Sequence, residues 1–178
     1  MHTDDRLILT RRQALTRSLW LLGAAASATA LGGSATRLLA AADERDVTIL
    51  SAALYLEHEA IAAYTAGAGS GLLPPPVLKV AGAFMDDHKY HRDGIAGVLK
   101  TLGVTPAGPA AAYHFGTLKT ADDILNLALR LEQGAATAYR TLASSVHNKT
   151  VLGFAAHVMV DEVRHATVLR DALKLRNY

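Results

Sequence analysis

Carboxylate and imidazole side chains recur at helical spacing in four segments of this 178-residue chain. Two of the segments contain a glutamate that is followed two turns later by a tyrosine, namely Glu57 with Tyr64 and Glu132 with Tyr139. The residues between them agree as well, because both segments read Leu-x-Leu-Glu-x-x-Ala-x-x-x-Tyr. The second half of the motif-bearing region therefore approximately repeats the first.

The other two segments carry paired residues of metal-ligand type. They read Asp-His-x-x-His at Asp87, His88 and His91, and Asp-Glu-x-x-His at Asp161, Glu162 and His165. Residues three apart on a helix share one face, so both members of each pair can reach one metal region. A glutamate from each of two helices, together with a Glu-x-x-His pair from each of two others, builds a dinuclear carboxylate site. These ligands suit iron or manganese and do not exclude zinc.

Four further residues are placed to support such a site. Asp87 and Asp161 directly precede the pairs and could hold the ring N–H groups of metal-binding histidines. Tyr64 and Tyr139 could donate hydrogen bonds to carboxylates near the site, or could simply pack with a polar tip. His157 could extend the site or line an entrance, although core or surface packing is the simpler interpretation. A bundle whose buried charges pair internally without metal remains the alternative for the whole set.

Four helices must position these side chains, and the sequence predicts them over residues 43–68, 76–102, 120–145 and 148–175. Apolar residues recur there at steps of three and four. Residues 104–119 contain proline and glycine and read as a loop. A structureless link of that length needs a reason, and a crossover that travels along a bundle supplies one. The expected fold class is therefore all-α, a four-helix bundle with a long crossover between its second and third helices.

Local signals support these boundaries. Gly103 is placed to close the second helix as a C-terminal cap. Thr120 is an N-cap candidate for the third helix, and Asp122 and Asp123 are favourable in its first turn. Asn148 can cap the fourth helix.

On these motifs the chain resembles the ferritin-like superfamily, especially its bacterioferritin and rubrerythrin branches and exported ferritin-like proteins, over about residues 45–175. The resemblance implies that the bundle holds two metal ions, expected to be iron, with manganese or zinc as alternatives. The ligands that it implies are Glu57 and Glu132 as terminal carboxylates, His91 and His165 as imidazoles, and Glu162 as a bridging carboxylate.

One position departs from the pattern of that superfamily. The second bridging glutamate should fall at position 88, where this chain has His88. With His88 as a ligand, the site contains three carboxylates and three imidazoles and carries less negative charge. Such a site could hold one metal tightly, or two with a different bridge. Asp87 could substitute as a ligand, but it is offset by one residue and points elsewhere on the helix.

The first 42 residues read as an export signal that precedes a bundle domain over 43–178. Five arginines and two aspartates occur there, and Arg11 and Arg12 precede the uncharged, alanine-rich stretch 18–36. The arginine pair resembles a twin-arginine signal, which implies a periplasmic or cell-envelope location. A cleaved signal, an uncleaved membrane anchor and an ordinary secretory signal remain open.

Composition excludes several other classes of protein. The chain has no cysteine, which rules out disulfides, thiolate zinc sites, iron–sulfur clusters and a cysteine nucleophile. Its formal net charge is +2, but the excess of basic residues belongs to the leader. The remaining residues are close to neutral, so the sequence gives little support for nucleic-acid binding.

The resemblance implies iron redox chemistry with oxygen or peroxide, as in a ferroxidase or a peroxide-reducing oxidoreductase. The residues that would carry catalysis remain unknown. The alternative is a non-enzymatic envelope bundle, stress-related or an accessory subunit of a larger membrane complex, with a structural or vestigial metal site. We expect a homodimer rather than a large storage shell.

Overall fold

The structure is a computed structural model that describes residues 44–146 and 148–174. The predicted export signal over residues 1–42, with its possible use as an anchor, lies outside the described residues. In the part of the chain that is described, no helix combines the length and the apolar character needed to span a bilayer.

Four long helices account for most of the described chain, and none of the described residues forms a strand. They are α3 (Glu44–Gly69), α4 (Pro75–Thr101), α5 (Ala121–Ser145) and α6 (Lys149–Ala172). Each of the four was predicted from the sequence, and the all-α fold class is confirmed.

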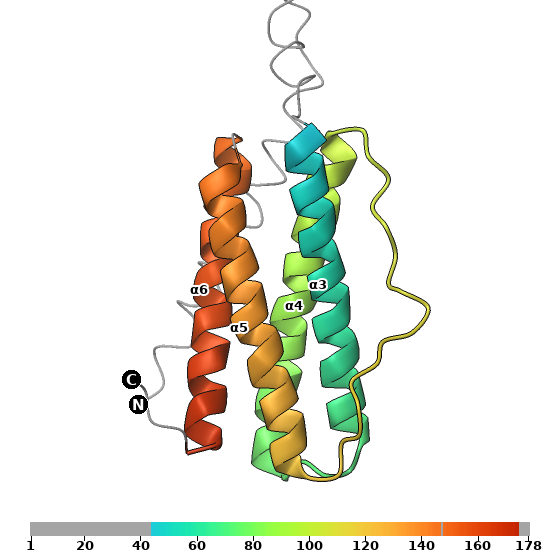
Figure 1. The fold of residues 1–178 in the computed structure, drawn as a ribbon, viewed down its shortest axis with the longest axis vertical. Helices are drawn as coiled ribbons and strands as arrows, with labels where there is room; N and C mark the ends of the chain where they lie inside the picture. The colour runs from blue at the N-terminus through green and yellow to red at the C-terminus, as the bar shows by residue number, and fades with distance from the viewer. Residues whose placement is uncertain (1–43, 147, 175–178) are drawn as a thin grey trace, which may run out of the picture. The chain divides into compact units, whose positions relative to one another are not determined.

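The helices form two hairpins joined by a long crossover (Figure 1). Helices α3 and α4 are joined by a short turn, as are α5 and α6. Residues 102–120 run along the outside of the bundle, from the end of α4 back to the opposite end where α5 begins (Figure 1). The first and third helices, α3 and α5, also pack against each other. This is the connectivity of a ferritin-like bundle.

The helix ends follow from local chemistry. Thr120 and Asp123 form a capping box, in which each side chain accepts a hydrogen bond from the backbone N–H of the other. Gly103 follows α4 with a φ of 77°, and its N–H donates to the carbonyl of Lys100 in the manner of a Schellman cap. At α6 the prediction of a helix to residue 175 was too long. The helix ends at Ala172, because Lys174 adopts the left-handed conformation with a φ of 54°.

The core consists of two apolar clusters, one toward each end of the bundle. The first cluster is centred on Leu50, Ile95, Leu142 and Val158, and the second on Phe84, Leu125, Leu129 and Leu169. On every helix, the residues with predicted metal chemistry fall between the residues of these two clusters. The fold therefore places a polar layer in the middle of an apolar bundle.

Candidate metal centre

All six predicted ligands meet in this polar layer. Each has a relative exposure of 1% or less. Helices α3 and α5 contribute one glutamate each, α4 contributes two histidines, and α6 contributes a glutamate and a histidine: Glu57, Glu132, His88, His91, Glu162 and His165. The three-residue spacing on α4 and α6 turns both members of each pair inward, as the sequence suggested. The structure brings the residues together, and their role as ligands stays a prediction.

His88 lies at the centre of the cluster. Its Nδ1 is 2.9 Å from Glu57 Oε2, and its Nε2 is 3.2 Å from Glu132 Oε1. The same Nδ1 is 3.8 Å from Glu162 Oε1. One imidazole ring therefore faces carboxylates that come from three other helices.

The remaining two histidines complete two overlapping groups of donor atoms. His91 Nδ1 lies 3.2 Å from Glu162 Oε1, and His165 Nδ1 lies 3.3 Å from Glu132 Oε2. Within each group, one donor atom per residue lies within 4.8 Å of the others. The groups are Glu57, His88, His91 and Glu162, and His88, Glu132, Glu162 and His165. The two groups share His88 and Glu162. Each group could therefore hold one cation, next to a cation held by the other group.

The aspartates face the outer nitrogens of the two flanking histidines. Asp161 Oδ2 lies 3.4 Å from His91 Nε2, and Asp87 Oδ2 lies 3.3 Å from His165 Nε2. Each aspartate thus reaches the histidine of the other helix rather than its own. This leaves the Nδ1 atoms of both histidines directed at the carboxylates of the centre, an arrangement that suits metal binding.

The tyrosines cross the bundle in the same way. Tyr64 on α3 donates a hydrogen bond to Glu132 on α5, and Tyr139 on α5 donates one to Glu57 on α3. Burial raises the pKa of both tyrosines, and the adjacent carboxylates raise it further, so both hydroxyls remain donors. These hydrogen bonds hold each carboxylate by one oxygen.

Two neighbours of the site were not singled out from the sequence. Arg164 Nη2 lies 3.1 Å from Asp87 Oδ2 and 3.0 Å from Asp161 Oδ1, and so joins the two aspartates. Phe84 stacks on the ring of His165 with centroids 3.9 Å apart. Both could have been found from spacing, since Arg164 is three residues after Asp161 and Phe84 is one turn before a ligand candidate.

His157 lies at the margin of the site. Its side chain is 48% exposed, and its Nε2 is 3.5 Å from Asp161 Oδ2. It therefore contacts the residue that supports His91 and does not reach the central carboxylates in the described structure.

The buried charges shift one another's pKa values strongly. Burial alone would lower the pKa of His88, but contacts with Glu132 and Glu57 outweigh it and raise the pKa to about 10. Burial likewise opposes charge on His91, yet Asp161 and Glu162 raise its pKa to about 11. For Glu162, burial and the neighbouring Glu132 raise the pKa to about 8. At neutral pH the metal-free centre therefore holds extra protons.

The donor set fits a pair of hard or borderline cations. Among the described residues, neither side-chain oxygen of Glu162 has a hydrogen-bond partner of good geometry, although both oxygens are fully buried. A buried carboxyl group without such a partner is costly, and a cation between the two donor groups would satisfy it. Carboxylate oxygens and imidazole nitrogens are the ligands that iron, manganese and zinc accept.

Fold and site together define a class, that of four-helix proteins with a buried carboxylate–histidine centre. Residues 45–175 match the model of the ferritin-like domain family, and the chain belongs to that family. No curated protein matches the chain.

Two solved structures extend the comparison. A conserved hypothetical protein from Mycobacterium tuberculosis is 28% identical, with a TM-score of 0.68 over 75% of this chain and 93% of the other. A ferritin-like, diiron-carboxylate protein from Bacillus anthracis is 19% identical, with a TM-score of 0.64 over 73% of this chain and 96% of the other. The second likeness supports the fold alone.

Proposed function

We propose that the protein is an exported ferritin-like protein whose buried centre binds two iron ions and uses them in iron oxidation or in reactions with oxygen or peroxide. The observation that carries the proposal is the pair of overlapping donor groups, which share His88 and Glu162 in a layer closed to solvent. The diiron-carboxylate character of the structural neighbour from B. anthracis agrees with it.

Iron in such a site would supply exchange between the ferrous and ferric states. The chain's own residues hold and orient the donors. Tyr139 and Tyr64 fix one oxygen of Glu57 and of Glu132, which leaves the other oxygen directed at His88 or His165. The burial of all the donors excludes bulk water from the centre.

Protons must leave when cations enter this centre. His88 and His91 can bind a metal only through an unprotonated nitrogen, and their raised pKa values mean that both rings carry an extra proton at neutral pH. Glu162, with a pKa of about 8, also holds a proton there. Metal binding should therefore release more than one proton per chain and should strengthen as the pH rises.

The cell-envelope location is part of the proposal and is supported by the twin-arginine-like sequence around Arg11 and Arg12. We also propose that oxygen or peroxide is the oxidant and that the bundle works as a homodimer or beside a membrane-complex partner. Light scattering on the exported protein tests the assembly state.

Elemental analysis of the natively exported protein tests the central claim. We expect about two iron or manganese atoms per chain, which should be lost in a Glu57→Ala, Glu132→Ala variant that still folds by circular dichroism. About one atom per chain would show that His88 has made the centre mononuclear. A well-folded protein that takes up no metal, even after anaerobic loading with ferrous iron, would refute the proposal.

A specific observation favours a second candidate, a non-enzymatic envelope bundle. His88 already lies between Glu57 and Glu132, so its positive charge can offset theirs without metal. This candidate predicts that a folded Glu57→Ala, His165→Ala variant still complements a deletion strain under envelope stress. Loss of complementation by that variant would eliminate it.

A further inference from the structure

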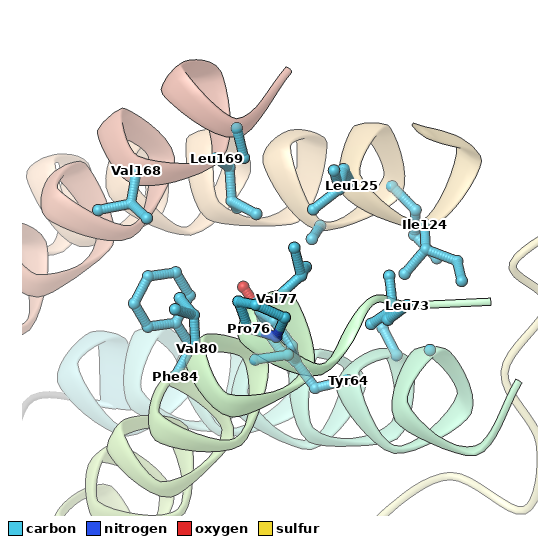
Figure 2. Close-up of a pocket in the computed structure, with 16 residues that line it drawn as sticks. Tyr64, Leu73, Pro76, Val77, Val80, Phe84, Ile124, Leu125, Val168 and Leu169 are labelled. Carbon is cyan, nitrogen blue, oxygen red and sulfur yellow. The ribbon is translucent and has the colours of Figure 1, made fainter. Parts of the chain in front are cut away.

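A cavity of about 210 Å³ opens beside the polar layer, toward the end of the bundle where α3 turns into α4. All four helices contribute to its wall. Figure 2 shows side chains of α5 and α6, including Leu125 and Leu169, facing those of α3 and α4 across the open space. Val80 and Val168 line the cavity and are 38% and 39% exposed, so a molecule can enter from solvent beside them.

The wall of this cavity is almost entirely hydrocarbon. No charged side chain occurs among the described residues that line it, and their only side-chain polar group is the hydroxyl of Tyr64. That hydroxyl donates its hydrogen bond to Glu132 on the other side of the wall. A polar or charged ligand would lose its hydration here without gaining a partner, whereas an apolar ligand loses nothing.

The inner wall of the cavity is also the wall of the polar layer. Phe84 lines the cavity and stacks on His165 with ring centroids 3.9 Å apart. Tyr64 lines it too, and its ring centroid is 5.4 Å from that of His88. An occupant of the cavity would therefore be separated from two candidate ligands by the thickness of one aromatic ring.

We propose that this cavity is a binding site for a small hydrocarbon molecule of about the size of toluene. The volume of the cavity supports a ligand of this size, because an apolar cavity of about 150 Å³ in another protein is large enough to bind benzene. Small residues keep the space open, because Ala81 and Ala128 stand where a longer side chain would fill it. The site is formed by the apolar end of the bundle and does not depend on a bound metal.

Toluene titration of the full-length, metal-free protein tests the proposal. We expect saturable changes in the methyl NMR signals of Ile124, Leu125 and Leu169, which line the cavity. Benzoate has a similar ring with a charge and should leave these signals unchanged, because its carboxylate would be buried without a partner.

Variants that fill the cavity provide the control. Ala128→Leu on α5 should weaken toluene binding at least about tenfold, and Ala81→Leu on α4 should do so if the first variant fails to fold. Ala136→Leu makes the same change at a half-buried position of α5 that does not line the cavity, and it should bind toluene normally. Signals that do not respond to toluene, or responses that persist in both filled variants, would overturn the proposal.

Discussion

Replacement of His88 by glutamate restores the carboxylate that the ferritin-like pattern has at this position, and it reverses a charge at the centre of the bundle. The His88 nitrogens lie 2.9 Å from Glu57 Oε2 and 3.2 Å from Glu132 Oε1. With a pKa of about 10, the metal-free ring is positively charged at pH 7. It is thus a cation that offsets the buried carboxylates around it.

The expected loss of unfolding free energy in His88→Glu follows from these contacts. Two unit charges about 4 Å apart interact by about 4 kcal/mol at an effective dielectric constant near 20, and removing one partner of a buried pair costs about 3–5 kcal/mol. Proton uptake by the clustered carboxylates limits the penalty. We therefore expect metal-free His88→Glu to lose about 3–5 kcal/mol of unfolding free energy, a large share of the roughly 5–15 kcal/mol that folded domains have.

Urea unfolding with and without metal is the assay. Ferrous or manganous ions should stabilise His88→Glu more than the native chain, because they bind the folded state and neutralise an additional carboxylate. His88→Gln, which has no charge, is the matched control and should gain less from metal. If metal-free His88→Glu is as stable as the native chain, or if metal stabilises both equally, His88 is not the central cation.

Three further predictions concern pH, one hydrogen bond and one close contact. The pKa of His88 is raised from 6.5 to about 10, so the protonated ring contributes its full stabilisation below pH 6.5 and loses it as the pH rises through 10. The melting temperature of the metal-free protein should therefore fall between these two pH values. A melting temperature that does not change with pH over this interval would contradict the prediction. Tyr139→Phe removes a buried hydrogen bond to Glu57 and should cost about 1–3 kcal/mol in urea unfolding, an effect that a solvent-exposed pair would not show. Gly94→Ala would place a Cβ 2.6 Å from the Phe154 ring, so we expect a loss of about 1–3 kcal/mol, and an unchanged urea midpoint would show that the ring can move aside.

The helices could be predicted because their boundaries depend on nearby residues. The capping box of Thr120 and the positive φ of Gly103 are encoded within a few positions of the chain. The end of α6 was predicted too late because no nearby residue marks it. Nothing in the sequence around Lys174 marks a stop, since lysine is an ordinary helix former and rarely adopts a positive φ.

The inward face of each site helix could also be predicted, because residues three apart must share a face. What spacing alone could not provide is the pairing across the bundle. Asp87 supports His165 rather than a histidine of its own helix, and Tyr64 supports Glu132 rather than Glu57. These partners depend on how α4 packs near α6 and how α3 packs against α5, which is tertiary information. The cavity depends in the same way on the fit of four helices.

Among the six candidate ligands and the aspartates and tyrosines that contact them, the two halves of the centre correspond at every position but one. Asp87 and Asp161 correspond, as do the two tyrosines and the two terminal glutamates, but His88 stands opposite Glu162. A symmetric centre would offer four carboxylates, whereas this one offers three. If two divalent cations were bound and the imidazoles were neutral, three negative charges would face them, and oxidation of the metals would add positive charge that no further carboxylate balances. The centre should therefore favour divalent over trivalent ions more than a four-carboxylate centre does, and His88→Glu should remove that preference.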